Sequence, residues 1–218
     1  MGWMLLSLFA WGLVHGVGPD HCLAIGALAA RGGPREAVGL SLRFGAGHAL
    51  VLAVCALGAS ALGVVIPARW EAALELVGGV ALIALGAWTV GAARDVDTDA
   101  HAFQGRRPGE HRHGGHRHGP GPVADVGGLA AIAGAVFGLS GVRGLVLLLP
   151  VALQGRVALT ALAVVLFGAG VMASMLAVGS LAQLVASRAR RVEQALHLGV
   201  GVLSVVVGSY WVVDHLGS

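Results

Sequence analysis

The chain has 218 residues, a formal net charge of +3, and 14 basic residues that are all arginines. Hydrophobic residues make up 56% of the chain and charged residues only 11%, whereas a soluble domain carries about 25% charged residues. This composition excludes a soluble globular protein and a nucleic-acid-binding protein, and it predicts an all-α membrane protein.

Six apolar segments are each long enough to cross a bilayer, which takes about 20 helical residues. They cover residues 2–30, 37–66, 71–92, 128–151, 157–186 and 193–214. We expect a first three-helix membrane unit over 1–92, a His-rich disordered loop over 93–127, and a second three-helix unit over 128–218. The chain therefore has one long connection and otherwise short ones.

The first span contains the segment "HGVGPDH" at residues 15–21. In a straight helix, Asp20 and His21 would lie roughly 140° and 240° around the axis from His15, so the three side chains could not meet. Pro19 lacks a backbone donor and disfavours helical geometry in the residue before it. We therefore expect the helix to break near Gly16–Pro19 and to turn His15 back toward Asp20 and His21. An irregular backbone inside a membrane is tolerated where it lines a cavity.

These side chains have the chemistry of a transition-metal site. Imidazoles and a carboxylate suit a first-row divalent ion such as Ni²⁺, Co²⁺ or Zn²⁺. The predicted ligands are His15, Asp20, His21 and, from the second span, His48, which Gly45 and Gly47 flank. Ionisable residues inside a membrane are functional by default. The alternative is that these histidines only form hydrogen bonds between helices.

The two halves of the chain show a weak internal repeat. "RFGAGHALVL" at 43–52 is similar to "LFGAGVMASM" at 166–175, which corresponds to an offset of 123 residues. Two units of three helices must have inverted topology, an arrangement common among transporters. We expect a 3+3 inverted repeat, in which His15, Asp20, His21 and His48 correspond to Gly138, Arg143, Gly144 and Val171.

Arginines predict the orientation of the chain. Ten of them lie in the connections after spans 1, 3 and 5, whereas only Arg69 and Arg156 lie in the connections on the other side. The positive-inside rule therefore places both termini outside and the long loop in the cytoplasm. That loop is a candidate auxiliary metal-binding segment, through His101, His111, His113, His116 and His118.

The sequence leaves open the roles of two further residues of the membrane spans, Arg143 and Cys22. Arg143 could pair with Asp20 when no metal is bound, anchor an anionic cargo, or only contact a helix end. Cys22 follows His21 directly and could take part in gating, although a cysteine in an apolar run is commonly a small buried hydrophobe. Glu75 is expected to complement the positive N-terminal end of the third span.

The H-x4-D-H pattern from His15 to His21 resembles the signature of nickel/cobalt permeases. "LRFGAGHALVL" at 42–52 is similar to their second signature, and "GLSGVRGLVLLLP" at 138–150 is most similar to the urease-accessory-type branch. The resemblance implies that His15, Asp20, His21 and His48 select the metal. It also implies a bacterial inner-membrane location and delivery to nickel-enzyme maturation proteins in the cytoplasm.

These observations predict a secondary carrier and not an enzyme. The cargo is Ni²⁺ or Co²⁺, bound as substrate and not as a permanent cofactor, and we favour uptake. The alternatives are metal efflux through the same site, or export of a small organic or sulfur oxyanion anchored by Arg143. An intramembrane enzyme that uses Cys22 is a further alternative, which we do not favour.

Overall fold

The computed structural model describes residues 2–32, 36–63, 68–104, 126–140, 148–186 and 190–216. These residues are helical apart from short turns and contain no strand, so the expected all-α class is confirmed. The helices are α1 (Gly2–Gly16), α2 (Pro19–Gly32), α3 (Ala37–Leu62), α4 (Ala68–Gln104), α5 (Val126–Ser140), α7 (Val157–Ala186) and α8 (Arg190–Leu216). A short helical segment covers residues 148–152.

Four of the described helices are long and apolar enough to cross a membrane, and α1 and α5 are apolar but shorter. The four are α3, residues 72–91 of α4, α7, and residues 194–216 of α8. Their outward faces carry large apolar side chains. Leu50, Val165 and Val213 are each more than 60% exposed. Apolar surface of this extent is typical of a helix bundle that faces lipid.

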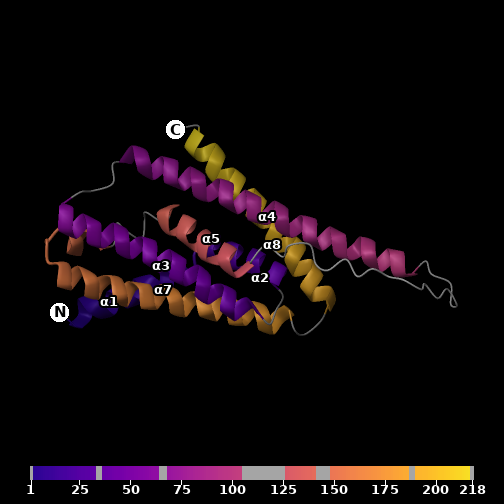
Figure 1. Ribbon diagram of the computed structural model, residues 1–218, viewed down its shortest axis with the longest axis horizontal. Coiled ribbons are helices and arrows are strands. Elements are labelled where there is room, and N and C mark those ends of the chain that lie inside the picture. The colour runs from indigo at the N-terminus through magenta and orange to yellow at the C-terminus, as the bar shows by residue number, and fades with distance from the viewer. Residues whose placement is uncertain are drawn as a thin grey trace.

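Helix α2 lies at the centre of the bundle. It contacts α3, α4, α5, α7 and α8, and its residues Leu23, Ile25 and Leu28 are buried. The tightest helix pairs surround it, with α1 against α7, α3 against α5, and α4 against α8. In Figure 1, α3 and α7 run along the long axis of the molecule, and α4 and α8 cross above them. The N- and C-termini both lie toward the left end of this view.

Glycines allow two of these helix pairs to touch through their backbones. A Cβ atom at Gly12 of α1 would lie 2.2 Å from the carbonyl oxygen of Phe167 in α7. A Cβ atom at Gly134 of α5 would lie 1.9 Å from the carbonyl oxygen of Phe44 in α3. Neither distance is possible for a real side chain, so only glycine permits this spacing. Close approach at small residues is the main source of helix association in membranes.

The break between α1 and α2 falls where the sequence predicts it. Helix α1 ends at Gly16, and Pro19 is the first residue of α2, a position at which the missing proline N–H costs nothing. The N–H of Gly18 donates to the carbonyl of His15 at 3.0 Å, and the N–H of Cys22 donates to the carbonyl of Gly18 at 3.0 Å. The chain therefore changes direction over two residues while its backbone groups remain paired.

Two helix boundaries differ from the predicted spans. Helix α4 continues to Gln104 through the polar residues after the third span, because no glycine or proline interrupts the sequence between Gly91 and Gly105. His101 thus lies on this helix. Helix α5 ends at Ser140, inside the predicted span 128–151, and Gly141 is the next residue in the sequence. Hydropathy predicts membrane crossing, whereas these ends depend on residues that break a helix.

Candidate metal centre

Three of the four predicted ligands lie together. His15 is in the last turn of α1, His21 is in the first turn of α2, and His48 is in the middle of α3. One ring nitrogen from each lies within 4.8 Å of the others. The ring centroids are 4.9 Å apart for His15 and His21, 5.4 Å for His15 and His48, and 4.7 Å for His21 and His48. The break at Gly16–Pro19 is what allows His15 and His21 to meet.

One pair of nitrogens in this cluster has the spacing that two ligands of one ion would have. Nε2 of His15 lies 3.3 Å from Nε2 of His48, and two ligands about 2.05 Å from a tetrahedral metal would be about 3.3 Å apart. Nε2 of His21 and Nδ1 of His48 are buried and have no hydrogen-bond partner among the described residues. Leaving a buried polar group unpaired costs about 1–3 kcal/mol. A cation held between the rings would remove this penalty at Nε2 of His21.

Asp20 lies behind His21 and outside the three-histidine cluster. Its Oδ1 is 3.0 Å from Nδ1 of His21, which is the distance of an ion pair. A carboxylate behind a metal-binding histidine orients the ring and raises its basicity. Gly18 leaves room for this contact, since a Cβ atom there would lie 2.6 Å from Oδ1 of Asp20.

This geometry separates the effect of Asp20 from that of the histidines. We expect Asp20→Asn to weaken Ni²⁺ binding by about 10–100-fold, the usual effect of losing a partner of a metal ligand. Calorimetric titration of the purified protein in detergent measures this change. If Asp20→Asn abolishes Ni²⁺ binding as completely as His21→Ala does, Asp20 is a direct ligand. If Asp20→Asn binds Ni²⁺ as tightly as wild type, Asp20 neither ligates the metal nor orients His21.

Three buried phenylalanines surround the histidines. The ring centroid of Phe167 is 5.5 Å from that of His15, and those of Phe44 and Phe137 are 6.1 and 6.3 Å from that of His21. All three are at most 1% exposed. Our sequence analysis missed these residues. Phe44 and Phe167 begin the two FGAG segments, and the chain has only five phenylalanines. Their matching positions in the repeat could have identified these two residues as part of the site.

A cavity of about 390 Å³, which we call the histidine cavity, reaches this cluster. Its lining includes His15, Asp20 and His21. It also includes Glu75, Asp214 and His215, from the beginning of α4 and the end of α8. The exposed fraction rises from 1% at His21 to 17% at His215. The histidine cavity therefore connects the buried rings with a more accessible part of the molecule.

Other predicted residues are not placed at this centre. Cys22 faces away, donating weakly to the carbonyl of Val17 at 3.5 Å, and it lines a separate apolar cavity together with His197. His101 lies on α4, and the structure describes no contact of its side chain. The remaining residues lie outside the described part of the chain, namely Arg143, His111, His113, His116 and His118.

Comparison with known proteins identified no relative of this chain. No protein-family model matches the chain, and neither the curated proteins nor the solved structures contain a match. The function proposed for the chain therefore rests on the chemistry of the residues themselves.

Proposed function

We propose that this protein carries a divalent transition-metal ion across a membrane, with Ni²⁺ as the main cargo and Co²⁺ as an alternative one. The observation that carries the proposal is the cluster of His15, His21 and His48, which is buried among helices and has unpaired ring nitrogens. His15 and His48 lie within hydrogen-bonding distance of each other, but purely structural histidines would be expected to pair their other buried nitrogens as well, and those of His21 have no hydrogen-bond partner among the described residues.

The ligand set suits transport as well as binding. Neutral imidazoles favour first-row divalent ions of this kind, and they hold such ions less tightly than several thiolates would. Phe44, Phe137 and Phe167 keep water away from the rings, so the ion must exchange its hydration shell for nitrogen ligands.

The packing of the helices supports a 3+3 inverted repeat. Gly12 and Gly16 of α1 face the Phe167 and Val171 carbonyls of α7, and in the same way Gly134 and Gly138 of α5 face the Phe44 and His48 carbonyls of α3. Phe44 and His48 correspond to Phe167 and Val171 at the offset of 123 residues. The same kind of contact thus occurs twice between the two proposed units, once for each FGAG helix. Rocking of two such units about a central site is the usual basis of alternating access.

The site is asymmetric in spite of this repeat. His48 of α3 corresponds to Val171 of α7, so only one unit supplies this ligand. A single ion would therefore bind on one side of the pseudo-symmetry axis. It would be released when the two units change their relative position.

We propose that the protein resides in the bacterial inner membrane with both termini outside and six spans, two of them interrupted. The arginine distribution and the resemblance to the urease-accessory-type branch of nickel/cobalt permeases support this orientation. The membrane potential contributes about 2.3 kcal/mol per charge per 100 mV, which favours inward movement of a dication without a coupled ion. Uptake would supply nickel-enzyme maturation proteins in the cytoplasm, and efflux through the same site would need a counter-ion.

Flux of radioactive Ni²⁺ in proteoliposomes tests this proposal. We expect saturable Ni²⁺ movement that Co²⁺ inhibits and Mg²⁺ does not, because Mg²⁺ prefers oxygen ligands. An imposed potential, negative inside, should accelerate entry into the vesicles. Ni²⁺ flux no greater than in protein-free vesicles would contradict the proposal. Sulfite movement without Ni²⁺ movement would favour the oxyanion alternative.

A further inference from the structure

We propose that Glu75 and His215 form a second divalent-cation site, through which the ion reaches the three-histidine cluster. The identity of the ion rests on the proposed function. The site itself rests on the geometry of the histidine cavity, where α4 and α8 bring together two residues that are 140 positions apart in the sequence.

The hydrogen bonds of His215 show why this pair can hold a cation. Nδ1 of His215 lies 2.8 Å from the carbonyl oxygen of Trp211. A carbonyl oxygen only accepts, so Nδ1 carries a hydrogen and Nε2 of the neutral ring carries the lone pair. Nε2 faces Oε2 of Glu75 within hydrogen-bonding distance. Two acceptors this close share a proton, and a divalent ion that displaced this proton would find both ligand atoms already facing the same point.

The charge of the histidine cavity also favours a cation. Three carboxylates line it, those of Asp20, Glu75 and Asp214. A cleft lined by one sign of charge concentrates the opposite ion and accelerates its association. Glu75 and His215 are 16% and 17% exposed, so an ion bound there can retain several of its water molecules.

The same cavity contains an unpaired ligand at its buried end. His21 is 1% exposed, it lines the cavity, and its Nε2 has no hydrogen-bond partner among the described residues. An ion leaving the Glu75–His215 pair would therefore meet a ligand that is otherwise unsatisfied. The ion would thus bind first at the Glu75–His215 pair, hydrated and weakly held, and then at the three-histidine cluster, dehydrated and buried.

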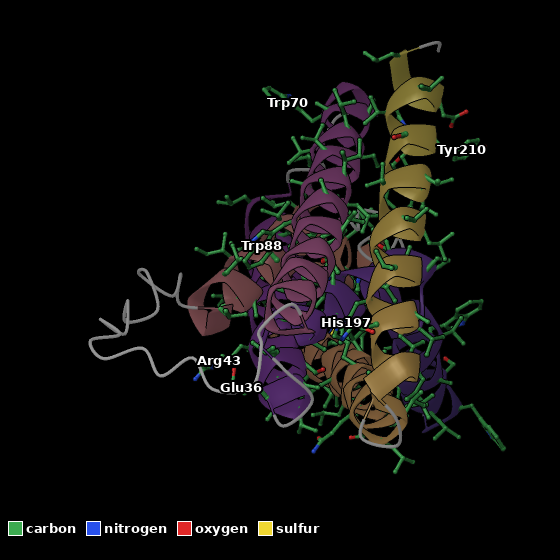
Figure 2. The ribbon with its side chains drawn as sticks, turned by 90° about the vertical axis from the view of Figure 1, so that its right-hand side faces the viewer. Glu36, Arg43, Trp70, Trp88, His197 and Tyr210 are labelled. Carbon is green, nitrogen blue, oxygen red and sulfur yellow. The ribbon has the colours of Figure 1, made fainter. Side chains whose placement is uncertain are left out.

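Figure 2 labels two residues that serve as controls, His197 and Glu36. Tyr210, which lines the histidine cavity, is near the end of α8 at which the chain finishes, whereas His197 lies much lower on the same helix. His197 lines the separate apolar cavity. Glu36 lies beside the beginning of α3, at the opposite end from Tyr210. His197→Gln and Glu36→Gln therefore make the same chemical changes away from the histidine cavity.

The test combines Ni²⁺ binding and Ni²⁺ flux on the full chain. Equilibrium dialysis against radioactive Ni²⁺ is expected to show a weakly bound ion at this pair in the wild-type chain. Glu75→Gln and His215→Gln should each bind one ion fewer than wild type, while any ions held by the His-rich loop are the same in all variants. In proteoliposomes their half-saturating Ni²⁺ concentration should rise on the order of tenfold, with a smaller effect on maximal flux. The two control variants should behave as wild type.

Further variants separate this inference from the proposed function. Glu75→Asp keeps the carboxylate and should keep the second ion, whereas a purely structural link between α4 and α8 would be disturbed by the shorter side chain. If Glu75→Gln and His215→Gln bind as many ions as wild type with wild-type half-saturation while His48→Ala loses flux, the second site is wrong and the carrier stands. If His48→Ala also transports normally, the proposed function fails.

Discussion

Replacement of His48 by alanine is expected to reduce Ni²⁺ flux in proteoliposomes by at least about 100-fold. Loss of a residue behind a metal ligand already costs about 10–100-fold in affinity, and His48 is placed as a direct ligand. It is fully buried in α3 and its Nε2 lies 3.3 Å from that of His15. No other described histidine, cysteine or carboxylate belongs to the cluster, so no described side chain can replace it.

The same substitution should leave the protein folded. Nδ1 of His48 is buried without a hydrogen-bond partner among the described residues, so its removal also removes an unsatisfied polar group. Thermal unfolding in detergent, followed by circular dichroism, should therefore be close to that of wild type. His21→Ala should lose flux in the same way, and His197→Ala, which removes a histidine from another cavity, should not. Wild-type Ni²⁺ flux in both His48→Ala and His21→Ala would contradict the proposal that these histidines bind the transported ion.

The second large effect is expected at a glycine that contacts no ligand. In Gly134→Ala, the new Cβ atom would lie 1.9 Å from the carbonyl oxygen of Phe44, so α3 and α5 must separate. Overpacking of this kind costs about 1–3 kcal/mol or more. The displacement would also move α3, which carries His48. We expect a lower midpoint of thermal unfolding together with a loss of Ni²⁺ flux.

Gly58→Ala is the matched control for this change. Gly58 lies on the same helix as His48, and a Cβ atom there would meet nothing within 4 Å. Alanine is favoured over glycine in a helix by about 1 kcal/mol, so this variant should be as stable as wild type or more so. Gly47→Ala tests the same α3–α5 contact from the other side, because its Cβ atom would lie 2.1 Å from the carbonyl oxygen of Ala131. Wild-type stability of Gly134→Ala would contradict the backbone contact.

The break in the first span could be predicted because its causes are local. Gly16, Gly18 and Pro19 act through backbone sterics and a missing donor within a few residues of the chain. The meeting of His15 and His21 follows from this break. The same reasoning did not extend to the fourth predicted span, where α5 ends at Ser140 and glycines alone gave a weaker signal than a proline. It also did not predict the continuation of α4 to Gln104, since hydropathy does not indicate where a helix ends.

The roles of several residues depended on distant parts of the chain. Asp20 was predicted as a fourth ligand, but the first turn of α2 places its carboxylate beside Nδ1 of His21. Glu75 was expected to complement a helix end, with a role in guiding metal ions from outside as the less favoured alternative, and it pairs with His215 because α4 packs along α8. The rotation of each helix about its axis decides such contacts. A short sequence motif does not encode that rotation.

The sequence by itself therefore determined the all-α class, the apolar helices, the position of the first break and the three histidines of the centre. Each of these follows from composition, from hydropathy, or from the geometry of a few adjacent residues. Only the tertiary structure decided that phenylalanines from three helices enclose the histidines, that Asp20 stands behind His21, and that one cavity joins the centre to Glu75 and His215. The enclosure by phenylalanines and the shared cavity depend on close packing of helices at glycines, which acts between residues more than about 80 positions apart.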